Sequence, residues 1–362
     1  MLLADSQNTS ALSIYTVRDV LLSFFDTAEA CTLRLLCNEF VAACRSFKWR
    51  DSRTVIRGSI ASWRACFPRA ISANVSCDWC MRRVAVADAD FVHFEGLHTL
   101  NMSCCRSVTD AAFVHLKGIK VLDMKWCYQQ RITDAAFVNL VGIQELDMGH
   151  CGQLTITGAA FAHLRGVQRL SICYCLQEAF TDAALAHLRG VQWLNMRFCS
   201  QASITDAAFI PLGGGHLKTL DITGCRQLTD AAFAPLRGLR ELTMLYCEQP
   251  SITDAAFEPL SGIQVLDMSW CSQATITDAA FAHLSGIQEL RMAGCSQAGI
   301  TDAAFAHLQG IKELDLRNCR QPAITGATFG RLKGIQVLRL FNCTEAAAEA
   351  AAAAGLPVLI GY

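Results

Sequence analysis

A threonine recurs in this chain every 24 residues, and this period restricts the possible folds more than any other feature. Eight of the recurring threonines are followed by Asp and two by Gly. A constant period of about 20 to 29 residues is typical of a solenoid, in which each unit packs only against its neighbours. The threonines are Thr109, Thr133, Thr157, Thr181, Thr205, Thr229, Thr253, Thr277, Thr301 and Thr325.

Each repeat predicts one short strand followed by one short helical element. The spacing L-x-x-L-x-L-x-x-C recurs, and one copy consists of Ile119, Leu122, Met124 and Cys127. Alternation around Leu122 and Met124 predicts a strand with these two side chains buried. Thr133 then caps a helix start, and Asp134 in the first turn favours the helix dipole.

Prolines and glycines limit the helical elements. Proline occurs within this part of the repeat at Pro211, Pro235 and Pro259. Because proline cannot continue a long helix, we expect elements of one or two turns, some of them 3₁₀. Glycines such as Gly142 end these turns. Stacked copies then form a continuous core, with a parallel sheet on the concave side.

Composition and cysteine usage indicate an intracellular, soluble chain. The formal net charge of −1 leaves no basic surface for nucleic acid or an anionic membrane. No signal peptide and no long apolar run are present. Of the 19 cysteines, eleven share one repeat position, and thiols in such number indicate a reducing compartment, the cytoplasm or the nucleus. The eleven are Cys105, Cys127, Cys151, Cys175, Cys199, Cys225, Cys247, Cys271, Cys295, Cys319 and Cys343.

This repeat resembles the leucine-rich-repeat family, in particular the cysteine-containing class found in F-box/leucine-rich-repeat proteins, the substrate receptors of SCF ubiquitin ligases. The resemblance covers roughly residues 70–362. It implies an α/β fold, a curved solenoid with a parallel concave sheet and short convex helices. It also implies a small helical F-box-like domain in front of the array.

The N-terminal segment carries an apolar helical face, and Asp26 to Glu29 resembles a capping box that opens a second helix through Phe40 to Cys44. The stretches Val20 to Asp26 and Leu35 to Phe40 resemble an F-box. The usual Leu-Pro start is absent, and Asn38 and Phe40 replace the usual Arg and Trp. The resemblance implies adaptor binding by Val20, Leu21, Phe24, Phe25, Leu33, Leu36 and Phe40. The alternative is a helical cap that only shields the first repeat.

We expect the following organisation: a flexible N-terminus (1–13), the F-box-like helical segment (14–50), a junction (51–70), the repeat array (71–343) and a C-terminal cap (344–362). Val75, Cys77 and Cys80 are interpreted as an incomplete first repeat with the L-x-L-x-x-C spacing. The cap should contain an alanine-rich helix and a last edge strand.

Metal and catalytic sites are weakly indicated. Cys77, Cys80, His93 and His98 have zinc-finger spacing, but the repeat pattern accounts for all four. The recurring histidines, such as His163 and His307, occupy equivalent slots and therefore do not converge. No nucleophile, base and orienting group come together by spacing. We therefore expect no metal, no cofactor and no enzyme activity.

The concave face carries the candidate target-binding residues. Its central column contains Asp123, Asp147, Asp221 and Asp267, and Lys125, Arg169 and Arg197 flank it. Two interpretations remain open: a solvated face with internal salt bridges, and a binding site that prefers a basic segment of a partner. A second stripe precedes each repeat cysteine: Trp79, Trp126, His150, Tyr174, Phe198, Tyr246 and Trp270.

These aromatic residues are either exposed anchors of an interface or rings that stack on one another. Gly224, Gly294, Asn318 and Asn342 interrupt the stripe, which would centre a site between residues 120 and 271. The predicted target-binding residues are Trp126, Asp123, Asp147, Tyr174, Arg197, Phe198, Asp221, Tyr246, Asp267 and Trp270.

The sequence thus predicts a protein-interaction module. The resemblance implies an SCF-type substrate receptor, with the adaptor subunit and cullin scaffold as partners and an unknown target protein on the concave face. A leucine-rich-repeat scaffold without a ubiquitin-ligase role is the alternative.

Overall fold

The computed structural model describes residues 22–35, 38–77 and 86–359, and the predicted sites at Val20, Leu21, Leu36, Trp79 and Cys80 lie outside these ranges. The chain divides into two compact units, residues 1–147 and 148–362.

The first unit begins with helices α2 (Thr27–Leu33), α3 (Asn38–Ser46) and α4 (Ile60–Cys66). Asp26 and Glu29 form the predicted capping box at the start of α2. The prediction of one continuous helix through Cys44 is wrong, because α2 ends at Leu33 and α3 begins at Asn38. Helix α4 lies in the segment that the sequence left as an unassigned junction.

An aromatic cluster packs these helices onto the first repeat. Trp49 and Phe67 are buried, and their ring centroids lie 5.4 Å apart. Trp63 of α4 contacts Phe67 and also Phe94 of the first repeat, with centroids 6.2 and 6.5 Å apart. The indole N–H of Trp49 donates to the carbonyl oxygen of Cys44 at 2.7 Å. Burial of these large rings therefore covers the end of the array.

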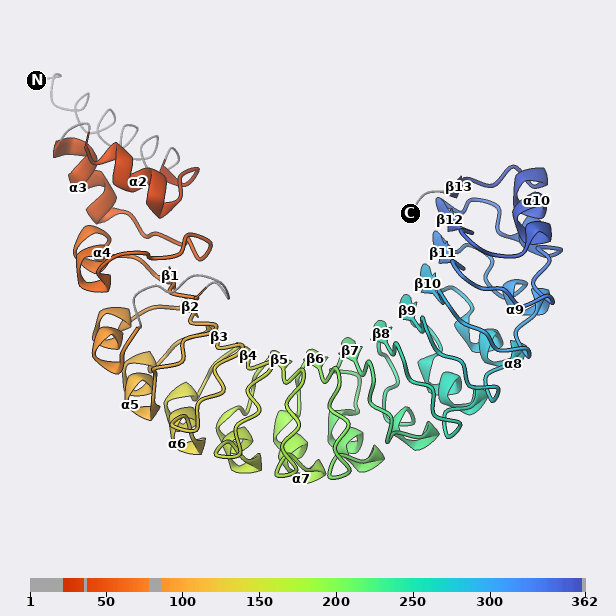
Figure 1. Ribbon diagram of the computed structural model, residues 1–362, viewed down its shortest axis with the longest axis horizontal. Helices are drawn as coiled ribbons and strands as arrows, with labels where there is room; N and C mark the ends of the chain where they lie inside the picture. The colour runs from red at the N-terminus through yellow and green to blue at the C-terminus, as the bar shows by residue number, and fades with distance from the viewer. Residues whose placement is uncertain (1–21, 36–37, 78–85, 360–362) are drawn as a thin grey trace, which may run out of the picture. The chain divides into compact units, whose positions relative to one another are not determined.

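Four strands of the first unit pair in parallel and in chain order. A helical element follows each of the first three strands, on the opposite side of the unit (Figure 1). In chain order the elements are β1 (Ser72–Asn74), η1 (Asp88–Phe94), β2 (Thr99–Asn101), α5 (Asp110–Phe113), η2 (Val114–Leu116), β3 (Val121–Asp123), α6 (Asp134–Phe137), η3 (Val138–Leu140) and β4 (Glu145–Asp147).

The register of the first repeat differs from its sequence interpretation by two residues. Ala73 pairs with Leu100, so Val75 takes the slot of Met102 and not that of the preceding leucine. The carbonyl of Val75 accepts from the Cys105 thiol, as the carbonyl of Met102 does from the next cysteine. Strand pairing with β2 decides the register, because a small alanine can occupy the leucine slot.

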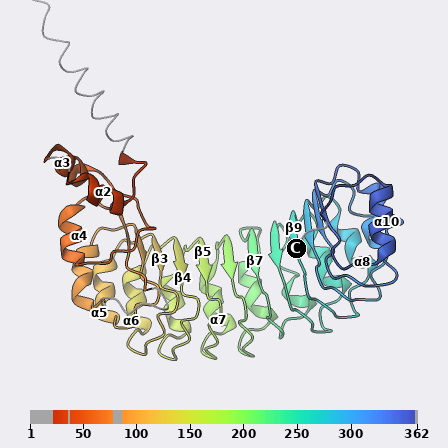
Figure 2. The same cartoon turned by 45° about the horizontal axis from the view of Figure 1, so that its top comes forward.

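The second unit continues the same pattern, and its strands β5 to β13 pair in parallel in chain order. Within this unit the strands line the concave side and the helical elements the other (Figures 1 and 2). The strands are β5 (Arg169–Ser171), β6 (Trp193–Asn195), β7 (Thr219–Asp221), β8 (Glu241–Thr243), β9 (Val265–Asp267), β10 (Glu289–Arg291), β11 (Glu313–Asp315), β12 (Val337–Arg339) and β13 (Val358–Leu359).

The helical elements of this unit are short and partly 3₁₀, as the prolines predicted. They are η4 (Gly158–His163), α7 (Asp182–Leu185), η5 (Ala186–Leu188), η6 (Asp206–Leu212), η7 (Asp230–Ala232), η8 (Asp254–Leu260), α8 (Asp278–Phe281), η9 (Ala282–Leu284), α9 (Asp302–Phe305) and η10 (Phe329–Arg331). The predicted alanine-rich cap helix is α10 (Glu345–Ala353), and Thr344 caps its start.

Carboxylate–threonine pairs, here called rungs, fasten neighbouring repeats on the helical side. Asp230 accepts from both the backbone N–H and the hydroxyl of Thr253, each at 2.7 Å. The threonine oxygen in turn accepts from Ala255 and caps its own helix. The same rung joins Asp88 to Thr109, Asp110 to Thr133, Asp182 to Thr205, Asp206 to Thr229, Asp254 to Thr277 and Asp278 to Thr301.

One repeat shows that the rung also orients the cap. Gly158 supplies no carboxylate to the next repeat, and there Thr181 makes no side-chain cap hydrogen bond. The sequence had assigned the aspartates only to the helix dipole. Their main contact is with the following repeat, which explains why Asp and Thr recur together.

Two polar columns run through the interior. Nearly all repeat cysteines donate their thiols to a carbonyl of the preceding repeat, for example Cys271 to Met244 at 3.1 Å and Cys295 to Met268 at 3.2 Å. In several repeats a glutamine two residues after the cysteine makes a similar bond, and Gln177 donates to the carbonyl of Cys151 at 2.6 Å. The sequence signal for this second column is a recurring C-x-Q, which the sequence analysis did not identify.

The rungs should contribute measurably to stability. Asp230→Ala leaves the N–H and hydroxyl of Thr253 without their acceptor, so the free energy of unfolding should fall by about 2 kcal/mol in urea denaturation. The control is Glu248→Ala, which breaks an exposed ion pair with Arg226 at 3.6 Å and should change that free energy by less than about 0.5 kcal/mol. Equal effects of the two substitutions would contradict the structural role of the rungs.

The buried thiols should make the chain sensitive to alkali. Burial raises the pKa of Cys127, Cys247 and Cys319 from 9.0 to about 12. An unfolded thiol loses its proton above pH 9, whereas these thiols keep theirs, so each weakens folding by up to about 1.4 kcal/mol per pH unit in that window.

Stability should therefore be unaffected by these thiols below pH 9 and should decrease from pH 9 towards pH 12. Melting curves at several pH values, read with the thiolate absorbance near 240 nm, measure both quantities. Thiolate absorbance of the folded protein beyond that of the cysteines that are not buried, such as Cys31, would contradict the prediction.

Candidate binding surface

The strand face is built from residues that follow one another at each strand end. At the end of β7 and β9, Asp221 and Asp267 accept from the backbone N–H of Thr223 and Ser269, two residues later, at 2.9 and 3.0 Å. This is an Asx-turn, which redirects the chain out of the strand. The next residue lies at the rim of the strand face, and the buried repeat cysteine follows it.

The rim residues adopt the left-handed backbone conformation. Six of them are aromatic, with φ between 56° and 62°: Trp126, His150, Tyr174, Phe198, Tyr246 and Trp270. This conformation costs a residue with a side chain about 1–2 kcal/mol. Hydrogen bonds to the next repeat hold it in place, and the N–H of Phe198 donates to Thr223 at 2.7 Å. Gly224 and Asn318 occupy the same position without a ring, so the turn itself does not require one.

The aromatic rim residues of the second unit, from His150 to Trp270, form a ring ladder. His150 and Tyr174 stack with centroids 4.5 Å apart and planes at 16°. Phe198 follows Tyr174 at 4.6 Å, and Trp270 lies parallel to Tyr246 at 6.3 Å. Tyr174, Tyr246 and Trp270 keep 38%, 36% and 44% of their surface exposed. The rings therefore stack on one another and still remain accessible to solvent.

Gly224 and Gly294 provide room for the rings. A Cβ at Gly224 would lie 2.5 Å from the Phe198 ring, and one at Gly294 would lie 2.6 Å from the Trp270 ring. In the sequence these glycines interrupt the aromatic stripe. In the structure each glycine accommodates the aromatic residue before it.

Lys125 bridges the two predicted carboxylates of the first unit. Its ammonium lies 3.3 Å from both Asp123 and Asp147. Burial raises the pKa of Asp123, and the bonds from Lys125 partly offset this effect. Burial lowers the pKa of Lys125, but the two carboxylates outweigh it, so this pKa is raised. These carboxylates are therefore satisfied within the chain.

Ion pairs also occupy the carboxylates near the end of the second unit. Arg317 binds Asp315 at 2.7 Å and Arg339 lies 3.4 Å from Glu313. Arg291 contacts Glu289 and lies 4.0 Å from Asp267. The internal salt bridges that the sequence allowed are thus present, and they leave little charge for a basic partner.

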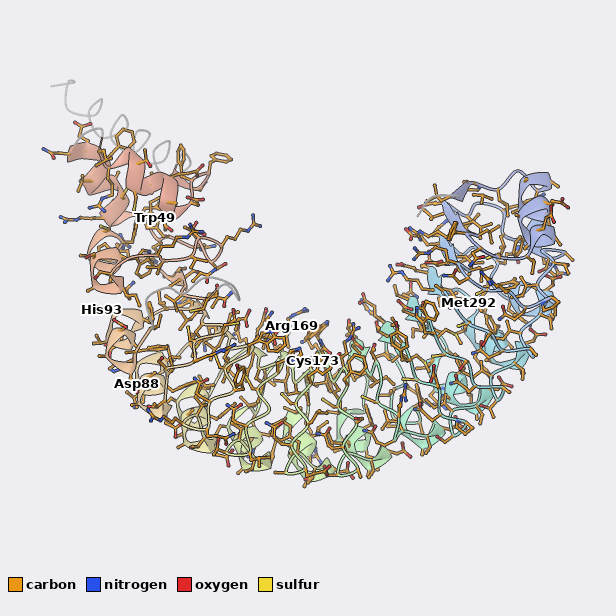
Figure 3. The ribbon with its side chains drawn as sticks, viewed as in Figure 1. Trp49, Asp88, His93, Arg169, Cys173 and Met292 are labelled. Carbon is orange, nitrogen blue, oxygen red and sulfur yellow. The ribbon has the colours of Figure 1, made fainter. Side chains whose placement is uncertain are left out.

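Two arginines of the strand face pack against aromatic rings. The Arg169 guanidinium carbon lies 4.6 Å from the Trp193 ring centroid, and that of Arg197 lies 5.4 Å from the ring of Phe198. Arg169 and Cys173 both lie on the strand side of the unit (Figure 3). Trp193 was not among the predicted site residues, because the neighbouring repeats have other residue types at this position, Arg169 and Thr219.

The described residues offer no group of three or more His, Cys, Asp or Glu that could hold a metal ion. His93 lies on the helical side of its unit, in η1 (Figure 3). No helix among residues 22–35, 38–77 and 86–359 has the length and apolar character needed to cross a membrane.

Neither protein-family models nor curated proteins match this sequence. Among solved structures, the TLR13–ssRNA13 complex matches with a TM-score of 0.59 and 18% identity, over 82% of this chain and 44% of that chain. The complex of Toll with Spatzle, from Drosophila, matches with a TM-score of 0.57 and 15% identity, over 79% of this chain and 42% of that chain.

This chain spans less than half the length of either of these two structures. At such low identity the likeness concerns the fold alone. The fold is that of a leucine-rich-repeat solenoid, as the sequence period predicted.

The fit between ring and glycine can be tested by a matched pair of substitutions. Gly294 and Gly262 both have positive φ, but only the Cβ added at Gly294 would meet a ring. Gly262→Ala should lower the free energy of unfolding by about 1 kcal/mol through backbone strain. Gly294→Ala should lower it by roughly 1–3 kcal/mol more and should change the emission of Trp270. Equal losses without a change in emission would show that the ring does not occupy this place.

Proposed function

We propose that the chain is a non-catalytic protein-binding module whose strand face holds a partner protein. The ring ladder supports this proposal most directly, because its five rim positions carry partly accessible aromatic residues in a strained conformation that glycine or asparagine adopts more readily. Aromatic residues are enriched among the anchors of interfaces. The two compared structures are complexes, one with a single-stranded RNA and one with Spatzle.

The finer proposal is a substrate receptor of an SCF-type ubiquitin ligase. The N-terminal helices would dock the adaptor subunit, which links to the cullin scaffold, and the strand face would hold the target. Such a receptor accelerates modification by raising the local concentration of its target. Free thiols at every described cysteine are compatible with a reducing compartment, and we propose the cytoplasm or nucleus.

The exposure of three phenylalanines in the N-terminal segment supports docking of an adaptor subunit rather than a cap function alone. Phe24, Phe25 and Phe40 expose 79%, 37% and 37% of their surface. The aromatic cluster that covers the array consists of other residues, chiefly Trp49 and Trp63. Phe24 and Phe25 also line a hollow of about 560 Å³ together with Trp49. The side chain of Leu33 lies outside the described set.

The alternative is a leucine-rich-repeat scaffold in which these helices serve only as a cap. The capping box of α2 and the burial of Ala30 and Cys44 are compatible with it. The two functions differ in what the exposed phenylalanines do. In a cap they contribute little, whereas in an adaptor interface they are anchors.

Binding of a purified SCF adaptor subunit distinguishes the substrate receptor from the scaffold with a helical cap. Phe24→Ala with Phe25→Ala should abolish binding and shift the melting temperature by only a few degrees, because both side chains are exposed. The control is Leu154→Ala, an equally exposed apolar side chain of the second unit, which should leave adaptor binding intact. Point substitutions are preferable to deletion of residues 1–50, because that deletion would also remove the buried Trp49.

Absence of adaptor binding by the unsubstituted chain would rule out the SCF proposal and leave a scaffold. A large loss of stability in the phenylalanine variant would instead assign these residues to the cap core.

A further inference from the structure

The ring ladder presents hydrogen-bond donors that the chain itself does not use. Among the described residues, the hydroxyls of Tyr174 and Tyr246 and the indole N–H of Trp270 find no acceptor. The rings themselves are more than half covered. Such side chains combine an apolar body with a polar tip, which is the composition of interface anchors.

Arg197 adds a cation to this line of donors. Its side chain is half-buried and lies against Phe198, which limits its motion. No carboxylate of the described residues lies within ion-pair distance of its guanidinium, in contrast to Arg291, Arg317 and Arg339. A guanidinium that is already held by a ring loses less freedom when it binds a carboxylate.

Acceptors of the same region are partly occupied. One carboxylate oxygen of Asp221 accepts from Thr223, and Asp267 is engaged by Ser269 and Arg291. Arg197 is therefore a cation of this surface without an ion-pair partner, whereas Asp267 already has one in Arg291. This favours an acidic segment over the basic segment that the aspartate column suggested in the sequence.

We infer that the ring ladder and Arg197 bind an extended acidic segment of a partner protein. A partner carboxylate pairs with Arg197, and backbone carbonyls or further carboxylates accept from Tyr174, Tyr246 and Trp270. The inference rests on the proposed binding function and specifies the chemical class of its partner.

The dimensions fit a short extended segment. The ladder takes one residue from each repeat, and neighbouring strands lie about 4.8 Å apart. From His150 to Trp270 the chain makes five such steps, which corresponds to roughly 24 Å. An extended segment of about seven residues covers this length. Its direction runs across the strands, along the rim.

Selection from a displayed library of random ten-residue peptides on the full chain tests the inference. Enriched peptides should carry net negative charge, and a synthetic peptide of this kind should bind at least ten-fold more weakly to Arg197→Glu. The matched control is Arg189→Glu, the same charge change on an exposed arginine of the helical side, which should leave affinity unchanged.

A second pair of variants distinguishes the contribution of the rings to binding from their contribution to stability. Tyr174→Asn and Tyr246→Asn introduce the residue that the chain itself uses at Asn318 and Asn342. These variants should melt within a few degrees of the unsubstituted chain, yet bind the acidic peptide at least ten-fold more weakly. Retained affinity in the asparagine variants would exclude the ring ladder as the binding surface.

Three other outcomes overturn the inference. Enrichment of basic or neutral peptides would preserve a binding module but contradict the acidic partner. Enrichment of no peptide would exclude a short linear segment as the partner. Arg197-dependent binding of a labelled oligothymidylate in place of peptides would assign the surface to single-stranded nucleic acid. The adaptor experiment concerns α2 and its surroundings, so its outcome does not affect this one.

Discussion

The carboxylate rung between neighbouring repeats organises this protein. In most repeats an Asp on the helical side accepts two hydrogen bonds from the threonine of the next repeat, as Asp230 does from Thr253. These charge-assisted bonds set the position of one repeat on the next, and the threonine then caps the following helix. The buried thiols and glutamines satisfy carbonyls between the same repeats. Polar contacts with defined partners thus determine the stacking, while the apolar core provides most of the driving force.

The same regularity prepares the strand face for binding. Because every Asx-turn delivers the chain to the rim in the left-handed conformation, any side chain placed there projects at a constant spacing. In the second unit five of these positions carry aromatic residues, which stack as His150, Tyr174 and Phe198 and as Tyr246 and Trp270, and Gly224 and Gly294 leave them space. Carboxylates of the central column serve the turns and the internal ion pairs. The accessible chemistry of the face is therefore found at its rim, beside Arg197.

Sequence reasoning succeeded where the signal is local and repeated. The period, the buried Leu122 and Met124, and the threonine caps all follow from a pattern within one repeat. It was less successful where two distant segments meet. The roles of the aspartates, the two-residue register of the first repeat and the break between α2 and α3 depend on contacts that no single repeat contains.

The sequence by itself determined that the chain is a solenoid with one strand and one short helical element per repeat. Period, alternation and proline positions are sufficient for this, because each repeat can bury its apolar side chains only against its own copies. The tertiary structure alone decided which polar groups remain available. Whether Asp221 or Arg197 can bind a partner depends on what its own turn and the adjacent strands already offer it, and the adjacent strands lie more than 20 residues away in the chain.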